Sequence, residues 1–304
     1  MARLAGRQAR HYGWDRDRPP AALVASGDVV TLSLVDAFDG QLTPAAEAAD
    51  VTALDLTRAN PLTGPVKVDG ARVGDAVVVE LLDITVDATG WTAIIPGFGL
   101  LADDFDDPHV IVSTRTDEDV AFGDVARLHL RPFVGTVGLA PAEPGEHDVI
   151  PPRDVGGNLD CRDVAAGTRL WLPVAVDGAL LSLGDAHMTQ GDGEVCGTAI
   201  ETAATVTARV HVVDGAAPST PRVEVSRFAD RAVVIGAKRH ELTTGVGPDL
   251  YAAARDATRA MIEQLTRNGL SAADAYALCS VAGHLRVIEV VDAPNWVVGM
   301  QLSY

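Results

Sequence analysis

Lysine, aromatic residues and cysteine are scarce in this sequence, and long apolar runs are missing. Only Lys67 and Lys238 are lysines, and 42 acids against 24 bases give a net charge of −18. Such an acidic chain repels nucleic acid, so we expect no nucleic-acid partner. The three cysteines are an odd number and scattered, which argues against a disulfide framework and favours a cytoplasmic protein. No stretch of about 18 apolar residues occurs and the basic N-terminal segment has no apolar centre, so we expect neither a membrane span nor a signal peptide.

The sequence does contain a globular composition and a recurring strand-entry pattern. Hydrophobic residues make up 47% of the 304, enough for a sizeable core in one large domain or two smaller ones. A Gly-Asp or Gly-Thr turn opens a Val- and Leu-rich run at Gly27, Gly74, Gly123 and Gly167. Short apolar runs bounded by Gly, Pro and Asp predict many short strands, and hence a β-sandwich or a barrel-like body.

Convincing helices are predicted only near the C-terminus. The segment 248–269 has apolar residues at helical spacing, with proline at its start and Asn-Gly at its end. Ser271, with an acid three residues later, is typical of the first turn of a second helix. The Pro- and Gly-rich segment 214–221 is the best candidate linker. We therefore predict a mainly β fold, with a β body at 1–215 and a smaller α+β subdomain packed against it at 216–304.

Metal- and proton-handling groups are concentrated in the stretch GDAHMTQGDGEVCGTAIE, residues 184–201. Asp185 and His187 are two residues apart, so on a strand their side chains point to the same side. They could hold a metal ion together with a carboxylate from Glu194 or Glu201. Alternatively, Asp185 could orient His187 as a general base. A third interpretation is purely structural, because Asp and Gly in turns often serve only the backbone.

The end of this stretch is predicted to continue as one long strand over 196–212. The even-numbered residues are mostly apolar, which places Cys196 on the buried face and Glu201 on the polar face. A buried thiol is inert, so we favour a structural role for Cys196 over a nucleophilic one. A GxSxG nucleophile motif does not occur in the sequence.

A second polar concentration, PPRDVGGNLDCRD, places Asn158 and Asp160 on one strand face directly after two glycines. From these residues alone, an ordinary Gly-Gly turn is a better explanation than a site. The polar turns in 35–44 and 54–66 are likewise interpreted as structural. The acidic segment 96–107 is interpreted as a solvated loop in preference to a substrate flap.

Taken together, these segments resemble the acetamidase/formamidase family. In that family a Gly-Gly-Asn-x-Asp segment leads into Gly-Asp-x-His-x-x-Gln-Gly-Asp-Gly-Glu, and here GGNLD precedes GDAHMTQGDGE. The likeness extends over nearly the whole chain, although Val155 stands where a His is expected before the glycines. The resemblance implies a mainly β, often dimeric protein that hydrolyses short aliphatic amides such as formamide or acetamide, with a divalent metal associated with the fold. The positions that match the motif are Asn158, Asp160, Asp185, His187, Gln190, Asp192, Glu194 and Glu201.

This resemblance leads to a concrete expectation for the chemistry. Amide hydrolysis requires an activated water, a polarised carbonyl and a proton for the departing ammonia. We expect Asp160, Asp185 and His187 to hold a divalent ion, either Zn²⁺ or alternatively Ca²⁺ or Mn²⁺. Glu194 or Glu201 is expected to act as general base and then as acid.

Further expectations concern the substrate and the assembly. Asn158 is expected to hold the oxyanion, and the expected substrate-binding residues are Gly157, Gln190 and Asp192. The predicted protein is a homodimer that binds a small amide. Two alternatives remain open at this point: hydrolysis of a larger, pathway-specific amide on the same fold, and a binding protein that keeps the fold without catalysis.

Overall fold

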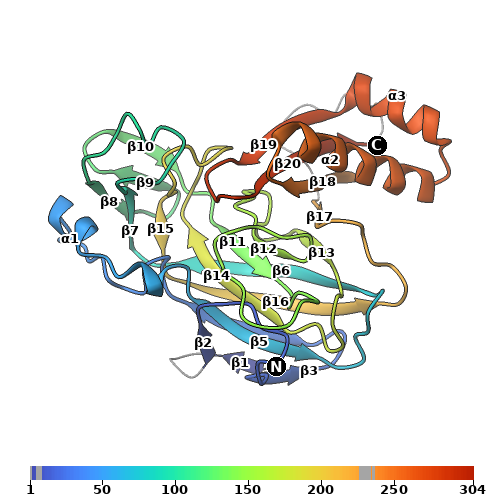
Figure 1. Ribbon diagram of the computed structural model, residues 1–304, viewed down its shortest axis with the longest axis horizontal. Coiled ribbons are helices and arrows are strands. Elements are labelled where there is room, and N and C mark those ends of the chain that lie inside the picture. Colours follow the sequence, from blue (N-terminus) through green and yellow to red (C-terminus); the bar gives the residue numbers. More distant parts are fainter. Residues whose placement is uncertain (1, 5–8, 226–233, 235–236) are drawn as a thin grey trace.

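The computed structural model describes residues 2–4, 9–225, 234 and 237–304, and two β-sheets dominate this part of the chain (Figure 1). Within it, the first sheet has nine strands in the order β1-β4-β16-β6-β13-β17-β18-β20-β19. In that order their bounds are Ala2–Leu4, Val29–Leu34, Ala204–Val213, Ala76–Val86, Arg169–Pro173, Arg222–Glu224, His240–Gly247, Trp296–Ser303 and His284–Glu289.

The second sheet carries eleven of the described strands, eight of them in the order β10-β9-β8-β7-β15-β14-β11-β12. In that order their bounds are Ala126–His129, Asp119–Phe122, His109–Arg115, Thr89–Ile94, Glu201–Thr202, Leu181–His187, Phe133–Gly138 and Gly156–Asn158. The other three strands are β5, Leu62–Val68, β2, Arg10–His11, and β3, Ala22–Val24. Strand β5 pairs with β14 and also with β2 and β3. Strand β14 therefore lies in the middle of this sheet and has hydrogen-bonded neighbours along both of its edges.

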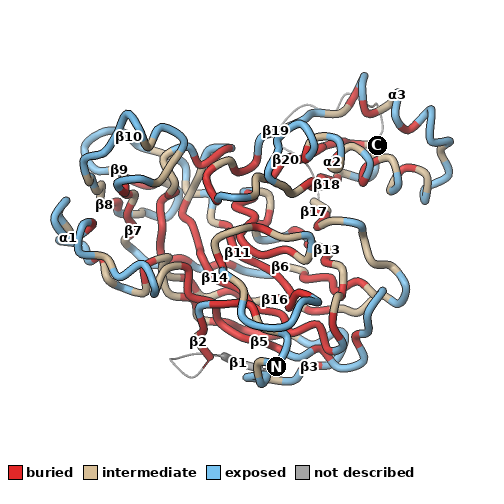
Figure 2. The backbone as a smooth tube through the Cα atoms, viewed as in Figure 1, coloured by how far each residue is buried: buried red, intermediate tan, exposed pale blue. Residues whose placement is uncertain are grey.

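One hydrophobic core joins the two sheets. Leu32 and Val206 of the first sheet and Val66 and Leu183 of the second belong to the same buried cluster, and none of the four side chains is exposed. Figure 2 shows this burial along the central strands, with exposed backbone at the loops and helices. The predicted mainly β fold is confirmed.

The predicted strand-entry turns are present at all four positions. Gly27, Gly74, Gly123 and Gly167 each have a positive φ, between 50° and 97°. They precede the first residues of β4, β6, β10 and β13 by two or three positions. Left-handed backbone is inexpensive for glycine alone among the residues, so the turn type explains why glycine recurs there.

The single long strand expected over 196–212 is not present. Its first part is a turn, the short strand β15 follows, and β16 begins only at Ala204. Within β16 buried and half-buried residues alternate as predicted. Glu201, however, is buried in β15 at 2% exposure and does not lie on a polar face. Cys196 lies in the turn and is half-buried.

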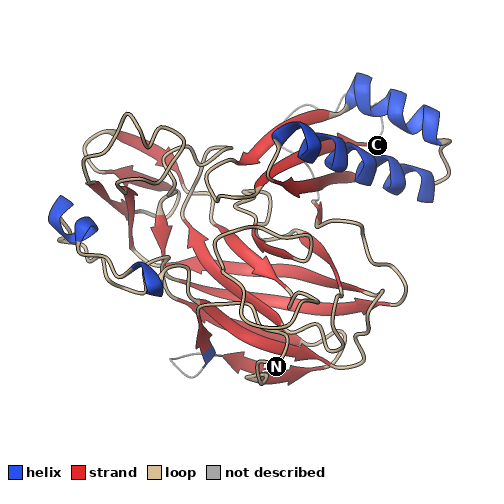
Figure 3. Ribbon diagram, in the orientation of Figure 1, coloured by secondary structure: helices blue, strands red, loops and turns tan. Residues whose placement is uncertain are grey.

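The C-terminal helices were predicted correctly. Helix α2, Leu250–Arg267, is capped by Asp249, and α3, Ala272–Ala282, is capped by Ser271. Both lie against the C-terminal strands, and α2 contacts β18 and β20 (Figure 3). Those strands continue the nine-stranded sheet across the predicted boundary at 215, so the division into two units stays a prediction. No helix in the described ranges is long and apolar enough to cross a membrane.

His11 fastens the N-terminal segment to β14, the strand that carries Asp185 and His187. Its ring lies 3.0 Å from the Ser182 hydroxyl and 2.8 Å from the Gly13 carbonyl. Burial lowers the pKa of His11 from 6.5 to about 4. The unfolded chain therefore takes up a proton first as the pH falls, and stability is lost between pH 6.5 and pH 4.

We expect His11→Asn to remove this part of the pH dependence. Between pH 7 and pH 5 the free energy of unfolding of the wild type should fall by about 2 kcal/mol more than that of the variant. Denaturant titrations at both pH values measure the difference. If the free energy of unfolding fell equally in the two proteins between pH 7 and pH 5, His11 would not contribute to the pH dependence of stability.

Candidate active site

Five polar residues from separate segments meet beside the C-terminal end of β14. Asp185 and His187 end that strand, and His187 pairs with Glu201 of β15 across the ladder. Asn158 ends β12, and Asp160 follows it two residues later. All five side chains are less than 5% exposed. The two sequence stretches singled out above therefore form a single buried group.

His187 lies at the centre of this group. Its Nε2 is 3.2 Å from Asp185 Oδ1 and 2.9 Å from Glu201 Oε2, yet among the described residues neither ring nitrogen has a hydrogen-bond partner of suitable geometry. Phe133 packs edge-on against the ring, with 4.8 Å between centroids, and fixes its plane. Nitrogen and oxygen atoms that approach this closely without a directed hydrogen bond are arranged like the ligands of a cation.

The donor atoms fall into two overlapping groups that share His187. Asp160, His187 and Glu194 form one, and Asp185, His187 and Glu201 form the other, with the atoms of each group within 4.8 Å of one another. Both carboxylate oxygens of Asp160 are buried without a hydrogen-bond partner in the part of the chain that the structure describes. Unpartnered buried oxygens beside an imidazole fit a divalent ion, so the predicted class of cofactor matches the residues present.

The electrostatics of the group support the same conclusion. Burial raises the pKa of Asp160 and of Glu194 well above the usual carboxyl range, and it raises the pKa of Glu201 to about 7. Burial alone would lower the pKa of His187, but the neighbouring carboxylates, Glu201 first, outweigh it and raise that pKa well above 6.5. Several buried carboxylates thus surround a single imidazolium, that of His187, and repel one another when ionised. A divalent cation would relieve this repulsion.

Gly135 of β11 leaves the space into which two of these carboxylates project. A Cβ atom at this position would lie 2.4 Å from Asp160 Oδ1 and 2.5 Å from Asp185 Oδ2. Its φ is not positive, so the requirement for glycine is steric. The backbone of β11 thus forms the wall behind the acidic cluster.

We expect Gly135→Ala to reduce bound metal and activity together by at least about tenfold, because a methyl group displaces both carboxylates. Metal content and ammonia release from acetamide, measured on one sample, test this. Gly247→Ala is the matched control, since its Cβ meets nothing within 4 Å. A Gly135→Ala protein with wild-type metal content would contradict the steric argument.

Asn158 is held in one orientation from both ends of its amide. Its Oδ1 accepts hydrogen bonds from Asn60 Nδ2, at 2.9 Å, and from the Thr136 hydroxyl, while its Nδ2 donates to Asp292 Oδ2 at 2.6 Å. Glu289 Oε1 in turn accepts the backbone N–H of Asp292 at 2.6 Å. One hydrogen of the Asn158 amide is left for another acceptor. Asn60 lies in the segment 54–66 that had been interpreted as structural, and Asp292 had not been singled out, because these bonds join residues 98 and 134 positions apart.

The acidic cluster forms the floor of a pocket of about 320 Å³. Its polar lining includes Asn60, Asn158, Asp160, Asp185, Thr198, Glu194, Glu201 and Asp292. Its apolar lining comes mostly from three segments that had been interpreted as structural or solvated, and it includes Phe38, Leu56, Ile95, Pro96, Phe98 and Ile150. These segments, including the start of 96–107, therefore supply walls of the pocket.

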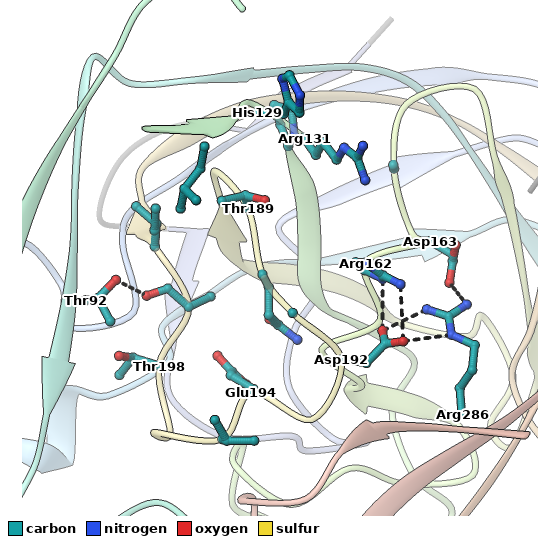
Figure 4. A pocket seen from close by; sticks show the side chains of 18 of the residues that line it. Thr92, His129, Arg131, Arg162, Asp163, Thr189, Asp192, Glu194, Thr198 and Arg286 are labelled. Atoms are coloured by element: carbon teal, nitrogen blue, oxygen red, sulfur yellow. Dashed lines mark hydrogen bonds and ion pairs between the residues drawn. The ribbon is translucent and has the colours of Figure 1, made fainter. Parts of the chain in front are cut away.

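A larger outer groove of about 1010 Å³ is lined by residues of the 194–198 turn, among them Glu194 and Thr198 (Figure 4). Glu194 and Thr198 line both spaces. Asp192, an expected substrate contact, faces this groove and pairs with Arg162 and Arg286 at 2.9 and 2.8 Å, so its carboxylate is already neutralised. Cys196 also lines the groove and not the inner pocket.

Two further expected contacts also lie outside the inner pocket. Gln190 lines the outer groove, and its Nε2 donates to the Asp160 carbonyl at 2.8 Å, which supports the segment carrying that acid. Gly157 is buried in β12, opposite Val137. Of the two, Gln190 supports the site through its bond to the Asp160 carbonyl.

Comparison with known proteins identifies the family of this chain. The sequence profile described as the Acetamidase/Formamidase family matches residues 3–147 and 145–304. The chain belongs to the acetamidase/formamidase family. A crystal structure of an acetamidase from Bacillus halodurans is 34% identical, with a TM-score of 0.89 over 99% of this chain and 97% of that one. An acetamidase from Yersinia enterocolitica is 30% identical, with a TM-score of 0.85 over 97% and 89% of the two chains. A formamidase from Methylophilus methylotrophus is 29% identical over 94% of this chain and 86% of its own.

Membership of the acetamidase/formamidase family confirms the predicted enzyme class, a hydrolase of amide C–N bonds. The structure also accounts for Val155, which stands where the family motif has a His. Val155 is half-buried and packs on the main core, and its carbonyl accepts a bond from the backbone N–H of Leu139. An apolar residue fits that position, and the atoms that could hold a metal come from other residues.

Proposed function

We propose that the chain hydrolyses aliphatic carboxamides of the formamide and acetamide type to the carboxylate and ammonia. The observation that carries this proposal is the pair of His187-centred groups of possible ligands, whose four carboxylates line the inner pocket. Family membership supports the same reaction. A homodimer in the cytoplasm stays part of the proposal, and the particle mass in solution, against 31.7 kDa for one chain, tests the dimer.

The proposed ligands of a divalent ion, Zn²⁺ in the first instance, are Asp160, Asp185, His187 and Glu201. One imidazole with several carboxylates suits Zn²⁺ or Mn²⁺. When bound there, such an ion supplies a Lewis acid that lowers the pKa of water and polarises a carbonyl. His187 is held for this role by Phe133, and Glu201 by the hydrogen bond that its Oε1 accepts from the Ala199 N–H at 2.7 Å.

Glu194 is the proposed general base. Within the described residues its side chain takes no hydrogen bond, whereas Glu201 Oε1 accepts the Ala199 N–H, so the Glu194 carboxylate is the one free to move a proton. It lies in the turn between the inner pocket and the outer groove, with 8% exposure. Its oxygen takes the proton of the attacking water and then donates it to the departing nitrogen.

Asn158 is proposed to bind the substrate oxygen. Its second amide hydrogen has no partner among the bonds described above, and the contacts with Asn60 and Asp292 hold the amide rigid. A donor fixed in advance stabilises the negative charge of the transition state without reorganisation.

Ammonia release tests the proposal. Purified protein supplied with Zn²⁺ is expected to release ammonia and the matching carboxylate, in equal amounts, from acetamide. Absence of release from acetamide, formamide and every longer carboxamide would leave only the alternative of a non-catalytic binding protein.

A further inference from the structure

The inner pocket is larger than a short amide requires. Its volume of about 320 Å³ corresponds to about ten water molecules, and acetamide would fill only about a quarter of it. Of its lining, Asp160, Asp185 and Glu201 belong to the groups around His187, whereas Phe38, Ile95 and Phe98 pack in a separate hydrophobic cluster. A formamide or acetamide bound at the acids would leave the rest of the pocket in contact with water.

The remaining space is walled by apolar side chains that are held in place. Phe38 stacks on Trp91 with 5.0 Å between ring centroids and 9° between planes. Phe98 packs directly on Gly197, where a Cβ would lie 2.5 Å from its ring. Phe38 and Ile95 belong to a small hydrophobic cluster of their own. The wall is therefore a formed surface and needs no rearrangement to receive an apolar group.

Leu56 extends this wall to the rim. It is 58% exposed, although it lies in the 3-10 helix Leu56–Arg58, which is well anchored. The Asp55 carboxylate caps this helix by accepting the Thr57 N–H at 3.1 Å, and Arg58 pairs with Asp39. A large apolar side chain held exposed at the rim of an apolar pocket is typical of a ligand-binding groove.

We propose that this wall is an acyl-binding subsite, and that the preferred substrates are carboxamides with an aliphatic acyl group of roughly four to six carbons. The proposal rests on the amide hydrolysis proposed above and extends its acyl range. The reacting carbonyl lies over the acidic floor, and the acyl chain runs along Phe38 and Ile95 towards Leu56. Each methylene that leaves water for this wall strengthens transition-state binding.

A homologous series of amides tests the subsite on the wild-type protein. From acetamide through propionamide and butyramide to pentanamide, kcat/KM is expected to rise about fourfold per added methylene, and isovaleramide should exceed acetamide by more than tenfold. A series in which acetamide or formamide is the best substrate would overturn the subsite while leaving the proposed function intact. If no amide in the series releases ammonia, both proposals fail.

Variants of the wall give the second test. Leu56→Ala should lower the pentanamide-to-acetamide ratio of kcat/KM about fivefold, because the rim loses its apolar contact. Ala59→Phe should lower it more than tenfold by filling the pocket, and the extended backbone of Ala59, φ −67° and ψ 149°, accepts a larger residue. Leu23→Ala is the matched control, since Leu23 is 62% exposed on β3, away from the pocket. Equal ratios in all four proteins would overturn the assignment.

Discussion

Replacement of His187 by alanine is expected to abolish bound metal and ammonia release together. His187 is the one residue common to both ligand groups, and it is completely buried. Without its nitrogen, the acids face one another with no base among them and cannot all stay ionised. We expect kcat/KM for acetamide to fall at least about 1,000-fold, because losing a bound Lewis acid costs several kcal/mol in the transition state.

Metal analysis and ammonia assays on the same His187→Ala sample measure this, with thermal unfolding to show that the protein is folded. His109→Ala is the control, because His109 is exposed on β8 and lines neither pocket. If His187→Ala kept its metal and its activity, the ligand assignment would be wrong.

The Glu194→Gln variant is expected to separate catalysis from metal binding. The amide has the shape of the carboxylate but cannot accept the proton of water, so kcat should fall about 100- to 10,000-fold. Metal content should stay at the wild-type level and KM should change little, because the proposed ligands are other residues.

Glu143→Gln serves as the control for this substitution, since Glu143 is exposed in a loop remote from the inner pocket. Loss of metal together with activity would make Glu194 a ligand. A kcat close to wild type would move the role of base to Glu201.

Local patterns in the sequence predicted much of the fold. The alternation within β16, the turn glycines and the capped helices all depend on neighbours a few residues away. The same locality explains why Asp185 and His187 were placed together correctly, at 3.2 Å in the structure.

The sequence pattern failed where the chain changes sheets. Thr202 pairs with Ala186 in the second sheet, whereas Ala204 pairs with Leu34 and Val86 in the first. The alternation of apolar residues continues through this crossing, so periodicity alone predicted one strand and put Glu201 on the wrong face. The crossing is what turns Glu201 towards His187.

The pocket walls could not be predicted for a different reason. Phe38, Leu56 and Phe98 come from segments with ordinary turn chemistry, and their role depends on non-local packing around the site. Asp292 comes from the C-terminal portion and reaches Asn158 across 134 residues of sequence. No pattern of spacing encodes such contacts, so only the folded structure reveals them.

The metal content of the purified protein, followed through chelation and assayed for acetamide hydrolysis at each step, decides whether the His187 cluster works as proposed. We predict about one divalent ion per chain, loss of ammonia release as that ion is removed, and recovery when Zn²⁺ is returned. Metal-free protein that hydrolyses acetamide at an undiminished rate would contradict the proposal.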